Sequence, residues 1–175
     1  GKRRRPRVLV LVPTRELAAQ VSDEMQNYGR RLSLRSTMIY GGVNIHPQID
    51  RLHRGVDIVV ATPGRLLDHA ERATINLSKI EFLVLDEADR MLDLGFIDDI
   101  LKVAEYLPAK RQTLLFSATY APNIKKLADE LLDNPRHIEV ARRNLAADAV
   151  TQVIYPAERK LKREMLSHLI IDGKW

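Results

Sequence analysis

Short apolar runs alternate with longer segments of helical periodicity along most of the chain. The runs are rich in Val, Ile and Leu, and they occupy residues 8–12, 36–40, 57–61, 82–85 and 113–116. A turn signal follows each run, and a segment with helical spacing of apolar residues follows the turn. Apolar strands that alternate with helices are typical of a parallel sheet covered on both faces. The pattern therefore predicts an α/β fold with an open, mostly parallel sheet.

Several helix starts can be predicted individually. Thr14 precedes good helix formers that run to about Leu32, and its hydroxyl is suited to cap the first turn. Thr62 and Pro63 repeat this signal, because a proline at the first helical position gives up no hydrogen bond. Further helices are expected to begin near Pro47 and Pro122 and to span residues 96–107.

The two ends of the chain depart from this pattern. Residues 1–7 are basic and contain a proline, which is typical of a solvated loop or tail that could also touch nucleic acid. Residues 141–149 are small and polar, which predicts a linker. This linker would separate a partial domain, residues 1–140, from residues 150–175. In the latter we expect a strand over 150–155 and an amphipathic helix over 160–171.

Composition narrows the class of protein only modestly. With 175 residues there is room for one well-buried domain. The net charge of +5 and pI near 9.6 favour a polyanionic partner, although many enzymes are as basic. The absence of cysteine excludes disulfides and thiolate metal sites, and the histidines are too scattered for a zinc site. No apolar run could span a membrane, so a soluble, cytoplasmic protein is expected.

Acidic residues directly follow the predicted strand at residues 82–85. In an open parallel sheet, ligands bind beyond the carboxyl ends of the strands. Asp86, Glu87 and Asp89 stand at such an end, and adjacent carboxylates suit Mg²⁺ and the phosphates that it carries. An isolated acidic pair is about as often a helix cap, but this one is accompanied by other polar groups.

Groups that can bind phosphate follow three other predicted strands. They are Thr14 with Arg15, Gly41 with Gly42, and Thr62, Pro63 and Gly64 with Arg65. They combine hydroxyls, helix N-termini, guanidinium groups and glycines that allow close backbone approach. Singly, each is more often a cap or a turn. Together at one edge, they predict a track for a single-stranded nucleic acid backbone, bound without sequence preference.

The fifth predicted strand is followed by two hydroxyl side chains. Ser117 and Thr119 could hydrogen-bond to a carboxylate on the neighbouring strand end, such as Asp89. Capping of the helix that begins near Pro122 is an equally good interpretation.

These stretches, in this order and at this spacing, resemble the DEAD-box ATP-dependent RNA helicases. The matching segments are Pro13-Thr14-Arg15-Glu16-Leu17-Ala18 (motif Ia), Gly41-Gly42, Thr62-Pro63-Gly64-Arg65 (motif Ib), Asp86-Glu87-Ala88-Asp89 (motif II) and Ser117-Ala118-Thr119 (motif III). The resemblance covers residues 7–171 and implies a RecA-like fold of the P-loop NTPase type. Residues 43–48 and 141–152 look most like the bacterial RhlE-like branch.

The resemblance implies roles for these residues. Asp86 would hold Mg²⁺ through water, and Glu87 would polarise the water that attacks the γ-phosphate of ATP. Asp89, Ser117 and Thr119 would couple the nucleotide site to RNA and to a second RecA-like domain. The remaining residues would lie along the RNA backbone: Thr14, Arg15, Gly41, Gly42, Thr62, Pro63, Gly64 and Arg65.

Two family features are missing from the sequence. Neither the phosphate loop Gly-x-x-x-x-Gly-Lys-Ser/Thr nor the adenine-reading glutamine motif occurs, which indicates an incomplete N-terminal RecA-like domain. The isolated chain is therefore expected to hydrolyse ATP negligibly. In the family, the phosphate-loop strand lies beside residues 113–116, so an open sheet edge prone to self-association is expected. The alternatives are a non-catalytic RNA-backbone-binding module and a metal-dependent phosphohydrolase.

Overall fold

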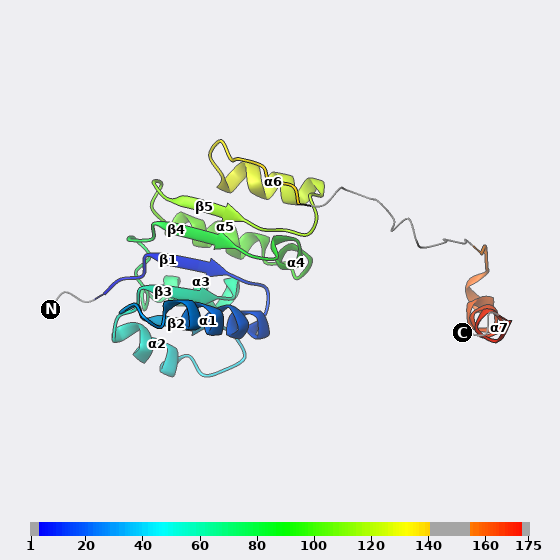
Figure 1. The fold of residues 1–175 in the computed structure, drawn as a ribbon, viewed down its shortest axis with the longest axis horizontal. Coiled ribbons are helices and arrows are strands. Elements are labelled where there is room, and N and C mark those ends of the chain that lie inside the picture. The colour runs from blue at the N-terminus through cyan, green and yellow to red at the C-terminus, as the bar shows by residue number, and fades with distance from the viewer. Residues whose placement is uncertain (1–3, 141–154, 173–175) are drawn as a thin grey trace. The chain divides into compact units, whose positions relative to one another are not determined.

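A computed structural model describes residues 4–140 and 155–172 of the chain (Figure 1). The chain divides between Pro135 and Arg136 into two units. The first unit contains β1 (Val8–Leu11), α1 (Arg15–Gly29), β2 (Ser36–Ile39), α2 (His46–His53), β3 (Ile58–Ala61), α3 (Pro63–Glu71), β4 (Phe82–Leu85), α4 (Ala88–Asp93), α5 (Ile97–Glu105), β5 (Gln112–Leu115) and α6 (Pro122–Leu131).

The strands form one sheet in the order β2-β3-β1-β4-β5, and every neighbouring pair is parallel. The predicted α/β fold with a parallel sheet is confirmed. The register is level across the whole sheet. The first residues of the strands pair in one row, from Ser36 to Gln112, and the last residues pair in another, from Ile39 to Leu115. All strands therefore begin at one rim and end at the opposite rim.

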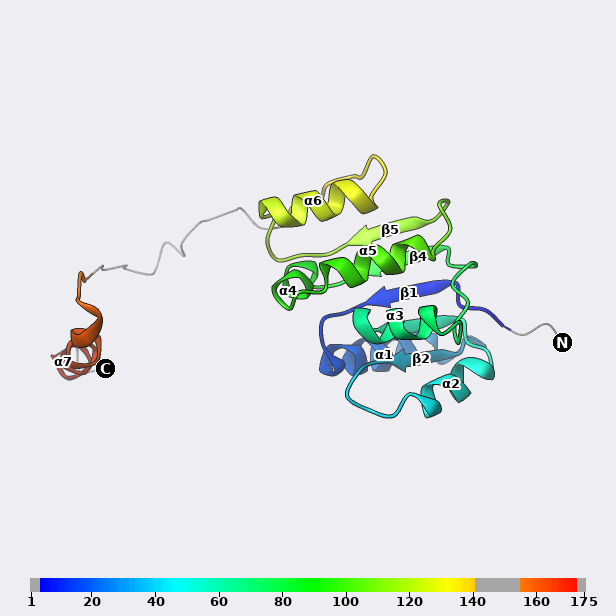
Figure 2. The ribbon, with the colours of Figure 1, turned by 180° about the vertical axis from the view of Figure 1, so that it is seen from behind.

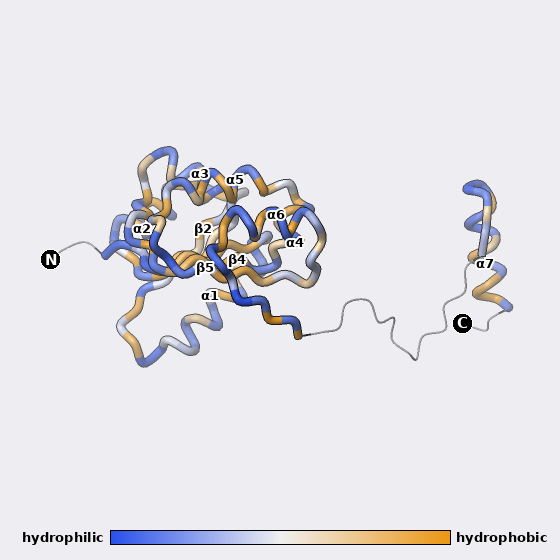
Figure 3. The backbone as a smooth tube through the Cα atoms, turned by 90° about the horizontal axis from the view of Figure 1, so that it is seen from above, coloured by the Kyte–Doolittle hydropathy of each residue, from blue (hydrophilic) through white to orange (hydrophobic). Residues whose placement is uncertain are grey.

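Helices cover the two faces of the sheet unequally. Figure 3 shows α1 on one side of the strands and α3 and α5 on the other, and Figure 2 shows the second group in front of the sheet. The larger core forms on this second face, where residues of α2, α3, α5 and α6 pack on alternate strand positions such as Leu9, Leu83 and Leu85. Under α1 lies a smaller core that includes Val10, Val12 and Val60. This alternation follows from the period of two along a strand.

The predicted boundaries differ from the observed ones by a few residues. α1 begins after Thr14 as predicted, but it ends at Gly29 rather than near Leu32. The Leu32 N–H donates to the Gly29 carbonyl at 2.7 Å, which closes a turn after the helix. β5 begins and ends one residue earlier than the predicted run. The helix predicted over 96–107 spans Ile97–Glu105.

Residues 4–7 of the basic N-terminal segment are mostly exposed and irregular, as predicted, but they are anchored to the domain. Pro6 is buried, and Arg7 forms two hydrogen bonds with the Glu81 carboxylate, at 2.8 and 2.9 Å. Arg4 binds the Asp57 carboxylate at 2.6 Å and the Ser33 carbonyl at 2.7 Å. Composition did not indicate this anchoring, because it does not show that carboxylates just before two strands face these arginines. From residue 4 onward the segment is part of the domain.

The second unit contains η1 (Arg159–Leu161) and α7 (Lys162–Asp172) among its described residues. The predicted helix is present with bounds shifted by one or two residues, and none of its residues is buried. The strand predicted over 150–155 lies almost wholly outside the described residues. The predicted domain boundaries at 140 and 149 stay predictions. Within the described ranges, no helix has the length and apolar character needed to cross a membrane.

β5 has a partner on one side only among the described strands. Its residues are at most half-buried, and Phe116, which follows it, is 53% exposed. The Gln112 N–H donates to the carbonyl of Glu81, just before β4, and the Phe116 N–H donates to the carbonyl of Leu85 in β4. Because donors alternate along a strand, the Thr113 and Leu115 N–H groups point away from β4. An unpaired apolar edge of this kind invites strand addition from another chain.

Thr113→Pro is expected to reduce self-association without breaking the β4–β5 ladder. Proline removes one outward donor, while the bonds to β4 use other residues. Analytical ultracentrifugation over a concentration series should show a concentration-dependent rise in mass for the unaltered chain and a weaker one for the variant. Leu114→Pro is the control, because it removes a donor that faces β4 and should destabilise the fold. A monomeric unaltered chain at all concentrations would contradict the prediction.

Candidate functional site

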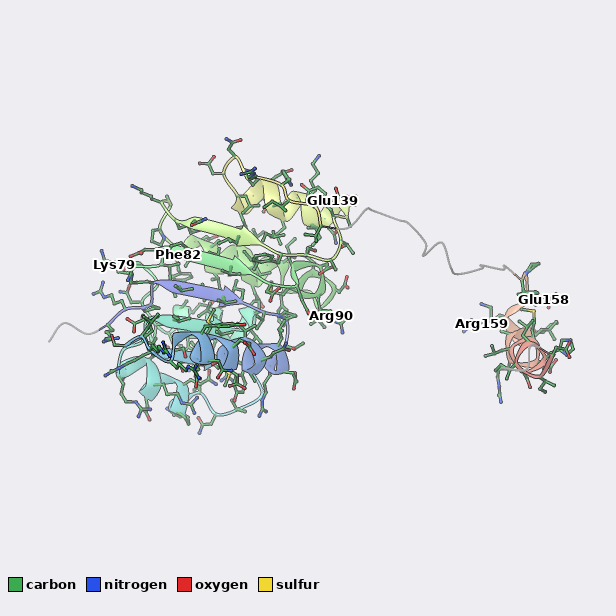
Figure 4. All side chains as sticks on the ribbon, in the orientation of Figure 1. Lys79, Phe82, Arg90, Glu139, Glu158 and Arg159 are labelled. Atoms are coloured by element: carbon green, nitrogen blue, oxygen red, sulfur yellow. The ribbon has the colours of Figure 1, made fainter. Side chains whose placement is uncertain are left out.

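The carboxyl ends of the strands gather the polar residues predicted for the site. The residues just after the strands continue the level register, as shown by hydrogen bonds from Thr62 N to Ile39 O at 2.9 Å and from Asp86 N to Leu11 O at 3.0 Å. Thr62 and Asp86 are thus two strands apart on one row, or about 10 Å. We call this edge of the sheet the carboxyl rim. In Figure 4, Arg90 lies at this end of the molecule, and Lys79 and Phe82 lie at the opposite end.

The acidic tetrapeptide turns sharply from β4 into α4. Glu87 adopts a left-handed conformation, with φ 51° and ψ 52°, and it is exposed. The Glu87 N–H donates to Asp86 Oδ1 at 3.0 Å, and the Ala88 N–H donates to the Phe116 carbonyl at 3.0 Å. Asp86 and Asp89 are half-buried. A left-handed glutamate is uncommon, because this conformation is unfavourable for residues other than glycine. Contacts with the surrounding structure, and not local backbone preference, therefore hold the turn in this conformation.

The donor set suits a hydrated magnesium ion rather than a protein cage. Among the described residues, no group of three or more His, Asp or Glu side chains is arranged to hold a metal. Asp86 keeps one carboxylate oxygen that no N–H group occupies, and Glu87 is open to solvent. Mg²⁺ usually keeps several waters and takes one or two carboxylates together with substrate phosphates. The carboxylates at this strand end fit that mode of binding.

Ser117 and Thr119 lie at the end of β5, beside the acidic turn. The Ser117 hydroxyl is buried and lacks a hydrogen-bond partner among the described residues, and Thr119 is exposed. The structure contains no hydrogen bond from either hydroxyl to Asp89, whose Oδ1 accepts from the Arg90 N–H. Neither hydroxyl caps α6, which begins after Ala121 without a side-chain cap. Ser117 therefore presents an unsatisfied donor next to the acidic turn.

Thr14 and Arg15 occupy the start of α1. The Thr14 Oγ1 accepts a hydrogen bond from the Leu17 N–H at 3.2 Å, so its hydroxyl acts as the predicted cap. Arg15 is exposed, and its guanidinium lies 5.0 Å from the centre of the Tyr40 ring. A cation over an aromatic face is held in place at low entropic cost. Sequence reasoning missed Tyr40, although its position directly after β2 was a signal.

The Gly41-Gly42 turn is fixed from two sides. Gly42 has φ 77°, which favours glycine, and an added Cβ at either position would meet nothing within 4 Å. Gln48 donates to the Tyr40 carbonyl at 3.0 Å, and Arg65 Nη2 donates to the Val43 carbonyl at 2.9 Å. The turn is thus open to solvent and anchored to α2 and α3 on its inner side.

α3 begins at Pro63 as predicted, but the Thr62 hydroxyl forms no cap hydrogen bond, so the predicted side-chain capping by Thr62 is wrong. Gly64 has a packing role that the sequence did not reveal, because an added Cβ would lie 3.1 Å from Asp99 Oδ2 on α5. Arg65 is mostly enclosed and tethers the glycine turn, with Nε 3.8 Å from Asp68 Oδ2. Its predicted contact with a phosphate stays a prediction.

A buried histidine supports the rim from beneath. His69 of α3 is fully buried, with Nε2 3.3 Å from Gln48 Oε1 and Nδ1 2.7 Å from Thr74 Oγ1. Burial, with a further contribution from the nearby Arg65 charge, lowers the pKa of His69 from 6.5 to about 4. The chain of contacts runs from Thr74 through His69 and Gln48 to the Tyr40 carbonyl, directly before the glycine turn. The position of His69 three residues after buried Leu66 was the available signal.

Comparison with known proteins identifies the family. The sequence profile of the DEAD/DEAH box helicases matches residues 1–127. The chain is 45% identical to "DEAD-box ATP-dependent RNA helicase 14" of Arabidopsis thaliana, over 92% of this chain and 27% of that protein. It is 44% identical to "ATP-dependent RNA helicase DBP2" of Lodderomyces elongisporus, over 92% of this chain and 29% of that protein. The chain belongs to the DEAD/DEAH box helicase family.

Solved structures agree with this assignment. A DEAD box protein from the hyperthermophile Methanococcus jannaschii has a TM-score of 0.71 and 42% identity, over 77% of this chain and 36% of that one. An RNA helicase described as hypothetical, from Sulfolobus tokodaii, has a TM-score of 0.71 and 42% identity, over 74% and 39%. The predicted RecA-like architecture is confirmed. The chain spans less than a third of the length of the two relatives named above.

His69 should make the stability of the fold depend on pH. Because its folded-state pKa lies below 6.5, the unfolded chain binds the proton more tightly. The contribution of neutral His69 to the free energy of unfolding is therefore present above about pH 6.5 and is lost as the pH falls toward 4. The loss amounts to roughly 2 kcal/mol between pH 7 and pH 5. Urea unfolding at both pH values measures this loss. His69→Gln should flatten the dependence, whereas the control His46→Gln, at an exposed position, should leave it unchanged. An equal slope in His69→Gln would contradict the prediction.

Proposed function

We propose that the chain is part of the N-terminal RecA-like domain of an ATP-dependent RNA helicase. In this proposal, the domain binds the backbone of single-stranded RNA and couples ATP hydrolysis to local unwinding, together with a second RecA-like domain. The supporting observation is the level register, which brings the residues of five motifs to the carboxyl rim. Family membership supports the same proposal, because the relatives are named as ATP-dependent RNA helicases.

The acidic turn is the proposed nucleotide end of the rim. Asp86 would hold Mg²⁺ through water, and Glu87, which is exposed at the turn, would orient the water that attacks the γ-phosphate. The bound metal supplies charge neutralisation on the phosphates. Asp89, Ser117 and Thr119 would couple this end to RNA and to the second domain. The unsatisfied Ser117 hydroxyl supports this role, because a partner arriving from outside would complete it.

The other end of the rim is the proposed RNA track. Arg15 is exposed and held over Tyr40, and the glycine turn is open to solvent. These groups recognise phosphate and sugar, so binding without sequence preference is proposed. Thr14, Gly41, Gly42, Thr62, Pro63, Gly64 and Arg65 complete the track. The Thr14 hydroxyl accepts from the Leu17 N–H and keeps its own O–H to donate. Arg65 uses Nη2 for the Val43 carbonyl, and its Nη1 has no partner among the described residues, so each side chain keeps an unused donor.

Three finer parts of the proposal rest on composition, on the unpaired β5 edge and on sequence resemblance. A cytoplasmic location and self-association through the β5 edge follow from composition and from the unpaired edge. The bacterial RhlE-like branch rests on residues 43–48 and 141–152, and the plant and fungal relatives named above lend it no support. A non-catalytic RNA-binding module remains the second candidate function, because the chain carries the track without a phosphate loop. The third alternative, a metal-dependent phosphohydrolase, stays a prediction.

Arg15→Ala should weaken the binding of single-stranded RNA by about fivefold to tenfold and reduce the slope of log K against log salt by about 0.7. The reason is the loss of one phosphate contact. Fluorescence anisotropy with a labelled oligouridine at several salt concentrations measures both quantities. The control is Lys102→Ala, which removes an exposed cation from the last turn of α5. Equal affinity of Arg15→Ala and the control would contradict the proposed track.

The purified chain should release no phosphate from ATP above background, with or without RNA. The carboxylates lack the lysine and the backbone cradle that hold a triphosphate in line for attack. A coupled phosphate-release assay checks this expectation. RNA-stimulated hydrolysis that disappears in Glu87→Gln would contradict it, and would mean that the chain builds a nucleotide site in another way.

A further inference from the structure

The rim where the strands begin carries a ladder of alternating charges. The residues just before the five strands, taken in sheet order from β2 to β5, are Arg35, Asp57, Arg7, Glu81 and Arg111. Their backbone groups continue the sheet, for example from Asp57 N to Arg35 O at 2.8 Å. Each carboxylate therefore has an arginine on both sides. We call this edge the amino rim.

The carboxylates of this rim are already engaged. Glu81 is bound by Arg7, and Asp57 accepts from the Arg35 N–H at 2.9 Å and from Arg4 at 2.6 Å. The Arg7 guanidinium also lowers the pKa of Glu81. No acidic group of the ladder is left to neutralise further cations. Any further arginine at this rim therefore lacks an acidic partner within the ladder.

Further arginines lie near Arg35, the outermost member of the ladder, at the corner where β2 begins and where α1 ends on one face of the sheet and α2 on the other. The corner consists of Arg30, Arg31, Arg35, Arg51 and Arg54, all of them exposed. Arg35 reaches α2 directly, because its Nη1 donates to the Arg54 carbonyl at 3.3 Å. Arg51 and Arg54 are three residues apart and share a face of α2. We call this set the basic corner.

Local structure does not account for the whole corner. Cations near a helix C-terminus are stabilised by the exposed carbonyls, but this effect is confined to the last turn, which contains Arg51 in α2 and no arginine in α1. Within the described part of the chain, however, no carboxylate lies within 4.0 Å of Arg30, Arg31, Arg51 or Arg54. Asp50 is the exposed acid nearest in sequence, one turn before Arg54, and it forms no ion pair with it. The repulsion among these guanidinium groups would be relieved by a bound polyanion.

An exposed aromatic ring belongs to the same corner. Tyr28 is 83% exposed on the last turn of α1, two residues before Arg30. A ring beside a basic surface offers a stacking face to an unpaired base, which a surface for acidic peptides does not require. These observations favour nucleic acid over an acidic protein.

We propose that the basic corner is a second RNA-binding surface, which contacts the phosphate backbone through its arginines and stacks one base on Tyr28. It is distinct from the carboxyl rim, because α1 separates them. Arg15 stands at the start of this helix and Arg30 just beyond its end, and 15 residues of helix span about 22 Å. The corner holds RNA that extends past the carboxyl rim and does not require ATP.

The test is a charge reversal of the corner, Arg51→Glu with Arg54→Glu, measured by anisotropy with an oligouridine of about 20 nucleotides. We expect at least a tenfold loss of affinity and a salt slope smaller by about 1.4, since two phosphate contacts are lost. The matched control is Lys102→Glu with Lys126→Glu, two exposed cations on α5 and α6, which should bind as the unaltered chain. Circular dichroism confirms that each variant is folded. Tyr28→Ala should add a loss of its own without changing the salt slope.

Arg15→Glu separates this proposal from the proposed function. If both sites bind RNA, the effects of Arg15→Glu and of the corner reversal should add, because the sites are far apart. If only Arg15→Glu weakens RNA binding, the proposed site at the basic corner is wrong and the site at the carboxyl rim remains. If only the corner reversal weakens RNA binding, the site at the carboxyl rim is wrong and the basic corner remains. Binding of poly-glutamate that is lost in the corner variant, with RNA binding intact, would overturn the proposal in favour of an acidic protein partner.

Discussion

The level register of the parallel sheet is the constraint on which the rest of this structure depends. Each strand is only four residues long, and all of them start and stop together. Parallel pairing makes every connection return across the sheet through a helix, so each strand end is followed by a turn into a new helix. Residues separated by more than a hundred positions, such as Thr14 and Ser117, are thereby placed along a single edge. A slip of one residue in any strand would displace its motif from this edge and would turn its buried side chains outward.

The same register produces a second edge with the opposite character. Most of the arginines described above lie where strands begin and helices end, and the carboxyl rim carries the acidic turn. The basic pI thus says little about the motif-bearing edge. Charges at the amino rim also stabilise the sheet itself, since unlike charges on neighbouring strands favour the observed pairing. Exposed pairs such as Arg7 with Glu81 contribute little to the free energy of unfolding. Their main effect is to favour this register of the strands over others.

The two faces of the sheet differ in how completely they are covered. The face under α2, α3, α5 and α6 buries a continuous core, whereas α1 is the one helix on the other face in the described part of the first unit. Val84 and Phe82 on β4 and the edge strand β5 are left partly exposed in consequence. Exposed apolar surface of this kind is typical of an interaction site, because covering it removes apolar area from water. Packing, rather than any single contact, therefore sets the stability of the β4–β5 side.

The sequence by itself determined the class of fold, the order of the elements and the family. Apolar periodicity and helix-start signals such as Thr14 and Pro63 depend on residues close together in the sequence, so they can be recognised without knowing the tertiary structure. Only the tertiary structure decided what each polar group faces. The Arg65 guanidinium donates to the Val43 carbonyl, Gly64 packs closely against Asp99, and His69 is buried against Gln48. Arg4 and Arg7 found carboxylates on strands far along the chain. These outcomes depend on distances between segments remote in sequence, which helical or strand periodicity does not encode.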